Sequence, residues 1–292
     1  MRKAEEGIFR GILGLLTLAT VLLLAFLIFF IARESLPAIR EVGLKELLLG
    51  DSWRPIIYKD APSYGMRNMI LSTLYVSAVA VVFALIIGVG CALFLACAAT
   101  SRQRTLVMPF IDLLASIPSV VYGFVGLYIV VKAFEKFGMA TGECVLAGGI
   151  VLSVMILPYM ISSCCDTMVR IRSRCGAASE SLGVSRWYMA GQLVLPASVR
   201  GILISMALAT GRAMGETMAV MMVMGNAIGL PRLLGKGETI SSLIAMEMGI
   251  AVVGSTHYSA LYTAGFVLMV ILFAINLIFE QLKKRLKGGG YL

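Results

Sequence analysis

Long uncharged apolar runs constrain the fold of this chain more than any other feature of its sequence. Residues 11–32 contain no charged side chain, and neither do residues 68–101. A helix needs about 20 apolar residues to cross the hydrocarbon layer of a bilayer, so each run is long enough to span it. Further apolar stretches, each with few charges, cover residues 105–131, 144–165, 200–230 and 249–279. The sequence therefore predicts an all-α polytopic membrane protein with six transmembrane helices.

The composition agrees with a chain whose main solvent is lipid. Hydrophobic residues make up 59% of the sequence and charged residues only 14%, whereas soluble domains contain about 25% charged residues. The net charge is +9, but the basic residues lie mainly between the apolar runs, which indicates topology rather than nucleic-acid binding. The six cysteines show no metal-ligand spacing and are interpreted as packing residues. His257 is the single histidine, which excludes a His-based metal cluster or a Ser-His-Asp triad.

Six spans would place both termini on the same side of the membrane. Lys and Arg favour that side in the short segments, so we expect the termini and the 166–200 segment to be cytoplasmic. The first run is interpreted as a retained span rather than a signal peptide. Residues 39–50 are predicted to form a short helix against the membrane surface, and residues 68–101 a single tilted helix.

The third span contains Pro109, Asp112 and Pro118. Proline inside a span frees a backbone carbonyl and kinks the helix, which is tolerated where neighbours or water satisfy that carbonyl. The segment SIPSVVYG either lines a pathway or makes a simple packing kink. Asp112 either meets a substrate or pairs with a basic residue near the cytoplasmic face.

Two opposite charges, Arg212 and Glu216, lie within the fifth apolar stretch, in the run GRAMGETMAV. A helix that starts near Gly201 would carry Arg212 roughly 17 Å inward, about the midplane of the bilayer. A charge there costs about 2.5–3.5 kcal/mol, so both side chains should face protein or water. On a continuous helix, residues four apart share a face. Either the arginine compensates an oxyanion such as phosphate, or the two residues form an internal salt bridge.

The 166–200 segment contains the run AASESLGVSRWYMAGQLVLP. Two short helical stretches are predicted there, separated by Gly183 and stopped by Pro196. Trp187 and Tyr188 give one stretch an amphipathic face, which either a partner groove or the lipid headgroups would bury.

Gly183, followed after nine intervening residues by the run LVLP, resembles the EAA motif of permease subunits in ABC importers. The resemblance implies the MetI-like fold of type I importers and a coupling helix that docks onto an ATPase. Ala177 stands where the motif usually has glutamate, so either Glu180 takes over its contact or the contact is absent. The residues expected to couple to the ATPase are Ala177, Ala178, Ser179, Glu180, Leu182, Gly183, Arg186, Trp187 and Pro196.

Three further segments, residues 51–55, 117–124 and 211–226, are similar to the PstC family of phosphate-importer permeases. This resemblance implies a phosphate pathway lined by Arg212, Glu216, Thr217, Ser119 and Tyr122. It also divides the chain into an N-terminal span with an external loop (1–65), a permease core with the cytoplasmic coupling loop 166–200 (66–284), and a cytoplasmic tail (285–292).

The same resemblance implies several partners in the cell membrane. These are a PstA-like second permease, two PstB-like ATPase subunits, an external PstS-like phosphate-binding protein and inorganic phosphate, with lipid around the spans and no nucleic acid. ATP and Mg would bind the ATPase, and no cofactor or metal is expected in this chain. The run GLPRLLGKGET lacks the Ser or Thr that a P-loop places after its lysine. The chain is thus expected to be a non-catalytic permease. The alternatives are a permease for phosphonate, sulfate or molybdate, and an ion-coupled secondary anion carrier.

Overall fold

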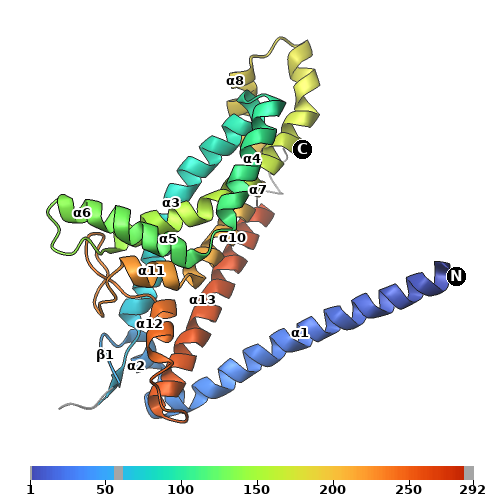
Figure 1. Ribbon diagram of the computed structural model, residues 1–292. Coiled ribbons are helices and arrows are strands. Elements are labelled where there is room, and N and C mark those ends of the chain that lie inside the picture. Colours follow the sequence, from blue (N-terminus) through green and yellow to red (C-terminus); the bar gives the residue numbers. More distant parts are fainter. Residues whose placement is uncertain (1, 56–61, 286–292) are drawn as a thin grey trace.

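The computed structural model describes residues 2–55 and 62–285, with side chains from Phe9 onward except that of Glu180 (Figure 1). It is built almost entirely from helices, three of them short π-helical turns marked η. The elements are α1 (Arg2–Glu41), α2 (Leu44–Leu49), β1 (Trp53–Arg54), β2 (Ser63–Tyr64), α3 (Arg67–Leu93), η1 (Phe94–Ala98), α4 (Ser101–Ala115), α5 (Ser119–Val125), η2 (Gly126–Val131), α6 (Lys132–Lys136), α7 (Val145–Ser181), α8 (Arg186–Tyr188), η3 (Met189–Val194), α9 (Leu195–Ala197), α10 (Val199–Gly215), α11 (Met218–Val223), α12 (Ile240–Glu247) and α13 (Thr256–Arg285).

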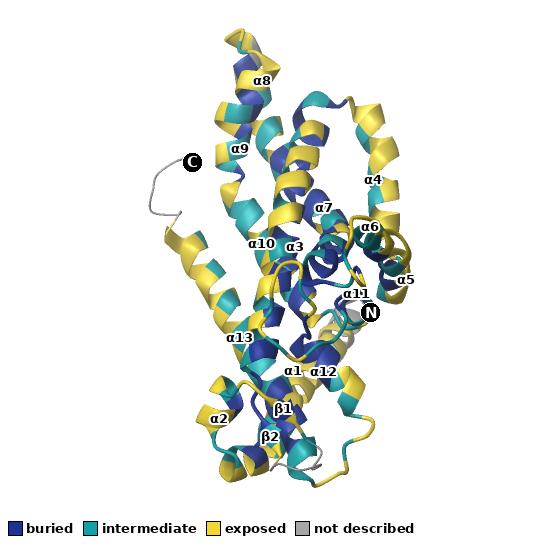
Figure 2. Ribbon diagram, turned by 90° about the vertical axis from the view of Figure 1, so that its left-hand side faces the viewer, coloured by how far each residue is buried: buried dark blue, intermediate teal, exposed yellow. Residues whose placement is uncertain are grey.

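The α3–α7 pair forms the centre of the main core. Ala80, Ala84 and Gly88 recur every four residues along α3 and are buried, as the dark blue of Figure 2 shows for both helices. A Cβ at Gly88 would lie 2.7 Å from Cγ of Met160, so the backbones approach closely there. In a membrane, small residues of this kind allow helices to pack through van der Waals contact.

Within the described residues, four helices are long and apolar enough to cross a membrane, and up to six spans result if each of two bent helix pairs counts as one. This is compatible with the predicted six. The straight spans are Phe9–Glu41, Arg67–Ala98, Val145–Ser179 and Thr256–Arg285. The second of them is one continuous helix, as expected, and its last turn is η1.

The C-terminal part of helix α1 contacts α13, and the rest of α1 extends away from the body of the protein (Figure 1). The 18-residue apolar window that marks it as a span is not buried at all against the rest of the chain. An apolar surface of that size requires lipid or another protein.

The predicted kinked helix over residues 105–131 is wrong in one respect, because the helix is broken rather than only kinked. Helix α4 ends at Ala115, α5 begins at Ser119, and the chain bends by 92° between them. Pro118 lies at the N-cap of α5, where its missing N–H costs nothing, and proline disfavours helical backbone in the residue before it. Pro109, by contrast, is accommodated inside α4.

The predicted continuous helix over residues 200–230 is also wrong. Helix α10 ends at Gly215, and Glu216 has extended backbone (φ −73°, ψ 131°) before α11 begins at Met218. The hydroxyl of Ser241, from the neighbouring helix α12, donates a 2.9 Å hydrogen bond to the Glu216 carbonyl. A tertiary contact thus satisfies a backbone group that the interrupted helix leaves open.

The 166–200 segment differs from expectation in two ways. Its first part is not a separate short helix, because α7 continues without interruption to Ser181. Pro196 does not stop the second part either: it lies in the first turn of α9, and the helical path continues into α10 with a bend of 61°. Gly183 is the turn between the two arms, with φ +67°.

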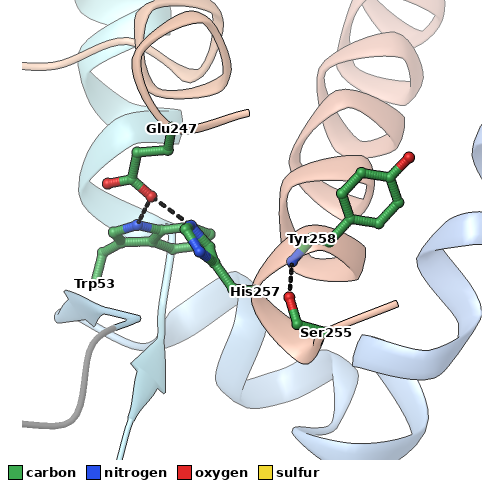
Figure 3. Close-up of polar contacts among 5 residues, drawn as sticks. All are labelled: Trp53, Glu247, Ser255, His257 and Tyr258. Carbon is green, nitrogen blue, oxygen red and sulfur yellow. Dashed lines mark hydrogen bonds and ion pairs between the residues drawn. The ribbon is translucent and has the colours of Figure 1, made fainter. Parts of the chain in front are cut away.

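A second, smaller core lies at the end of the molecule that carries α2, β1, β2 and α12. The helix predicted over residues 39–50 is present only in part, as α2, because residues 39–41 still belong to α1; Leu47 of α2 is fully buried. Strands β1 and β2 form a two-residue antiparallel pair in which Trp53 lies opposite Tyr64, a small departure from an all-α chain. Trp53 Nε1 donates to Glu247 Oε2 at 2.8 Å, and His257 Nε2 lies 2.8 Å from the same oxygen (Figure 3). Glu247 therefore joins the strand pair to both α12 and α13.

Candidate functional site: a cavity beside the helix breaks

A cavity of about 480 Å³ lies between α4, α7 and α10. Helix α7 supplies four of its residues, two come from the end of α4, and the remainder come from α10. Its lining residues are Asp112, Ala115, Pro158, Tyr159, Ser162, Ser163, Ser205, Leu208, Ala209 and Arg212.

Arg212 is the positive charge of the cavity. It lies in the last turn of α10, where the partial negative charge of a helix C-terminus stabilises a cation. Its guanidinium carbon is 4.4 Å from the centroid of the Tyr159 ring, a cation–π contact. Among the ion pairs of the described residues, none includes Arg212. Its charge is held by neutral groups and is available to an anion.

Hydroxyl groups of α7 tie the cavity wall together. Tyr159 donates to the carbonyl of Ala115 at 3.0 Å, and Ser162 donates to Oδ1 of Asp112 at 3.0 Å. Ser205 on α10 donates to Ser163 at 2.7 Å. The Ala115 carbonyl is open to Tyr159 because α4 ends there, and the last carbonyls of a helix have no partner within it. The helix break thus supplies one of the polar contacts of the cavity wall.

The structure separates Glu216 from Arg212. Glu216 lies beyond the end of α10, so the predicted shared helix face does not exist, and no ion pair in the described part of the chain joins the two side chains. Glu216 Oε1 instead lies 3.5 Å from the backbone N–H of Ala219, near the start of α11. A carboxylate is favoured at a helix N-terminus by the exposed N–H groups there.

The other three predicted pathway residues also lie outside the cavity wall. Ser119 is the first residue of α5, and Tyr122 is buried and donates to the carbonyl of Leu114 at 2.8 Å. Thr217 is the N-cap residue of α11. Helices α5 and α11 pack together, since a Cβ at Gly123 would lie 2.7 Å from the Met222 sulfur. These residues lie beside the two helix breaks and not on the cavity wall.

The sequence analysis missed Tyr159, Ser162, Ser163 and Ser205. A signal was present, because Tyr159, Ser162 and Ser163 recur at the three- and four-residue spacing that puts polar groups on one face of an apolar helix. Asp112 was singled out with two possible roles, and it lies on the cavity wall with Arg212. No group of His, Cys, Asp and Glu in the described residues could hold a metal ion.

The coupling hairpin, residues 177–196, lies at the opposite end of the molecule from β1 and β2 (Figure 1). Its tip is apolar and open: Leu182 is 80% exposed and Trp187 75% exposed. Of the other predicted coupling residues, Ala177, Ala178, Arg186 and Pro196 are exposed and Ser179 is buried, while the Glu180 side chain lies outside the described residues. Exposed apolar tips of this kind mark contact sites.

Gly183 and Arg172 shape this hairpin. The positive φ of Gly183 lets the Val184 N–H donate back to the carbonyl of Ser179 at 3.0 Å, a Schellman-type helix ending. At the base, Arg172 Nη1 donates to the carbonyl of Ala96 at 2.6 Å, in the last turn before Ala99. A cation at a helix C-terminus is favourable, so Arg172 fixes α7 to the end of α3.

Apolar spans, a cation-bearing cavity beside two broken helices and an exposed hairpin at one end define a membrane-embedded transport subunit. The family model "Binding-protein-dependent transport system inner membrane component" matches residues 84–288. The chain belongs to this family of inner-membrane transport components.

Several relatives are similar over most of their length. "Probable ABC transporter permease protein YqgH" of Bacillus subtilis is 34% identical over 244 residues, 83% of this chain and 78% of that protein. "Probable phosphate transport system permease protein PstC" of Methanocaldococcus jannaschii is 32% identical over 279 residues, 88% of this chain and 86% of that protein.

Solved structures agree on the fold. An alginate ABC transporter in complex with a periplasmic protein matches with a TM-score of 0.60 and 16% identity, covering 94% of this chain and 96% of the other. The inward-facing MetNI methionine transporter matches with a TM-score of 0.58 and 16% identity, covering 73% of this chain and 92% of the other. The fold is that of ABC importer permeases.

Proposed function

We propose that this chain is the permease subunit of an ATP-driven phosphate importer and forms half of the transmembrane pathway. The observation that carries the proposal is the guanidinium of Arg212, which lines a cavity between spans with no carboxylate paired to it in the described residues. A charge within a membrane span is costly, and such charges commonly mark the pathway of a substrate or ion. The relatives named PstC support phosphate as that anion.

Arg212 compensates the charge of the passing anion, and the hydroxyls of Tyr159 and Ser205 border the same space. The route then continues past the two breaks, along Ser119 and Tyr122 at α5 and Glu216 and Thr217 at α11. Glu216, a negative charge four residues beyond Arg212, limits how tightly the anion is held, because a site that binds too well cannot release.

Energy for uptake has to come from a partner. Moving one negative charge into a cell against about 100 mV costs about 2.3 kcal/mol before any concentration gradient. The exposed tip at Leu182 and Trp187 docks into a groove of an ATPase, which binds ATP and Mg. A PstA-like second permease, two PstB-like ATPase subunits and an external PstS-like phosphate-binding protein complete the importer.

The coupling hairpin and both termini face the cytoplasm in this proposal. In Figure 1, α13 extends from the end that carries β1 and α2 toward the end that carries α8, whereas α1 leaves the same lower end and extends away from the body. The basic residues Lys283, Lys284 and Arg285 close α13, as the positive-inside tendency requires of a cytoplasmic end.

The test is ATP-driven phosphate uptake by the reconstituted complex with Arg212→Ala, Arg212→Lys and Glu216→Gln. Losing a charge-assisted contact should reduce uptake by Arg212→Ala at least about tenfold. Arg212→Lys keeps the charge but not the fork, so partial uptake is expected. Wild-type uptake by Arg212→Ala would overturn the pathway. Uptake without ATP would favour an ion-coupled carrier, and stronger competition by sulfate, molybdate or phosphonate than by phosphate would favour another cargo.

A further inference from the structure

Asp112 is fixed on the cavity wall with one carboxylate oxygen left open. It lies on α4, one turn before the helix ends, and its Oδ1 accepts the 3.0 Å hydrogen bond from Ser162. Asp112 is exposed, and within the part of the chain that the structure describes its Oδ2 has no protein hydrogen-bond partner. Because a carboxylate can only accept hydrogen bonds, Oδ2 can take a proton-bearing group from the cavity.

The same cavity therefore contains a cation on α10 and an anion on α4. Arg212 alone would attract any oxyanion, since its guanidinium recognises charge and planar oxygens without regard to protonation. A carboxylate nearby repels every anion, and only an anion that carries an acidic O–H offsets this repulsion by donating a hydrogen bond to the carboxylate. A cavity lined by both Arg212 and Asp112 suits a ligand that is negatively charged and also carries an acidic O–H.

We propose that Asp112 is a specificity residue that accepts a hydrogen bond from a protonated oxyanion and repels a fully ionised one. This inference rests on the proposed phosphate pathway past Arg212. Phosphate carries at least one P–O–H group near neutral pH, whereas sulfate and molybdate carry no proton. A site that hydrogen-bonds a ligand hydroxyl strongly rejects the analogue that lacks it, because its own polar group is then left unpaired.

Ser162 is the positioning residue for this selection. Its hydroxyl occupies Oδ1 and so orients the carboxylate from α7, across the helix contact. Without that bond the Asp112 side chain can rotate, and the carboxylate loses its fixed direction toward the cavity. The selection is thus expected to depend on the Asp112 charge first and on Ser162 second.

The experiment is equilibrium binding of labelled phosphate to the complete transporter in detergent without the external binding protein. Omitting that protein removes its own selectivity from the measurement. Arsenate, which has the same protonation pattern as phosphate, and sulfate serve as competitors. In the wild type, sulfate should need at least about tenfold more than arsenate to displace phosphate. In Asp112→Asn this gap should close to within about threefold, because the neutral amide no longer repels sulfate.

The Ser162→Ala variant should partly reduce the difference between sulfate and arsenate as competitors. It decides the outcome if Asp112→Asn fails to assemble on size-exclusion chromatography. Asp166→Asn is the matched control. Asp166 lies on α7 one turn after Ser162 and does not line the cavity, so this variant should keep the wild-type difference between sulfate and arsenate. An unchanged gap in Asp112→Asn would overturn the role of Asp112. If Arg212→Ala loses phosphate binding at the same time, the phosphate pathway survives. Full phosphate binding by Arg212→Ala would overturn the pathway itself.

Discussion

The guanidinium carbon of Arg212 lies 4.4 Å above the ring of Tyr159, whose hydroxyl in turn donates to the carbonyl of Ala115. One side chain on α7 thus contacts the end of α10 and the end of α4. Both helices stop where the cavity opens. The arrangement places an aromatic ring against an exposed cation and leaves the N–H donors of that cation for a ligand.

Two substitutions of Tyr159 separate these contacts. Tyr159→Phe keeps the ring under Arg212 and removes only the bond to Ala115, so a modest loss of phosphate uptake is expected. Tyr159→Leu removes both and should reduce uptake further, by about two- to thirtyfold, as expected for a cation–π contact of about 0.5–2 kcal/mol. Initial rates of ATP-driven uptake in proteoliposomes measure both. Equal rates in the two variants would show that the ring contact does not contribute.

The apolar tip of the coupling hairpin should determine assembly with the ATPase. Trp187→Ala and Leu182→Ala remove large exposed side chains, and a central aromatic anchor is commonly worth at least about 2 kcal/mol of binding. Less ATPase should therefore co-purify with these variants. Phe137→Ala is the matched control, because Phe137 is 88% exposed but lies in the turn after α6. Equal loss of ATPase from all three variants would contradict a specific docking site.

Replacing Gly183 should strain the hairpin turn without removing any contact. A Cβ there meets nothing within 4 Å, but an L-residue at φ +67° costs about 1–2 kcal/mol. Gly183→Ala should therefore speed hydrogen exchange at the Val184 amide and lower uptake at unchanged phosphate binding. Gly191→Ala also meets open space but has no positive φ, so it should exchange as the wild type does. Identical exchange in both variants would exclude the backbone explanation.

Glu238 should make stability depend on pH. It is 5% exposed, and burial together with the charge of Glu247 raises its pKa from 4.5 to about 7. Between these two values the folded state holds a proton that the unfolded chain has released, so the free energy of unfolding falls as the pH rises through this window. This loss of unfolding free energy is absent below both pKa values and complete above pH about 7.

Glu238→Gln should remove this penalty. Its stability relative to the wild type should rise by up to about 3 kcal/mol from below pH about 4.5 to above pH about 7. Thermal unfolding of the complex in detergent at both ends of the range measures the change. Glu247→Gln removes the neighbouring charge and should show a smaller gain in stability relative to the wild type over the same pH range. A difference between Glu238→Gln and the wild type that stays constant with pH would contradict the raised pKa.

Some of the site was readable from the sequence. Arg212 stands out because a charge in an apolar span is expensive wherever the helix lies, and Gly183 because a glycine after a helical run commonly ends it. Tyr159 and the serines of α7 do not stand out in the same way. A hydroxyl in a span can satisfy itself on its own helix, and only its neighbours show whether it does.

The positions of the four straight membrane helices were determined by the sequence alone, because the cost of placing charge or unpaired backbone in lipid applies residue by residue. The breaks at residues 116–118 and 216–217 were decided by the tertiary structure. An interrupted helix is stable only where another element satisfies its open carbonyls, as Tyr159 does for Ala115 and Ser241 does for Glu216. These partners are distant in the chain, so the cavity beside Arg212 exists only once α4, α7, α10 and α12 have packed together.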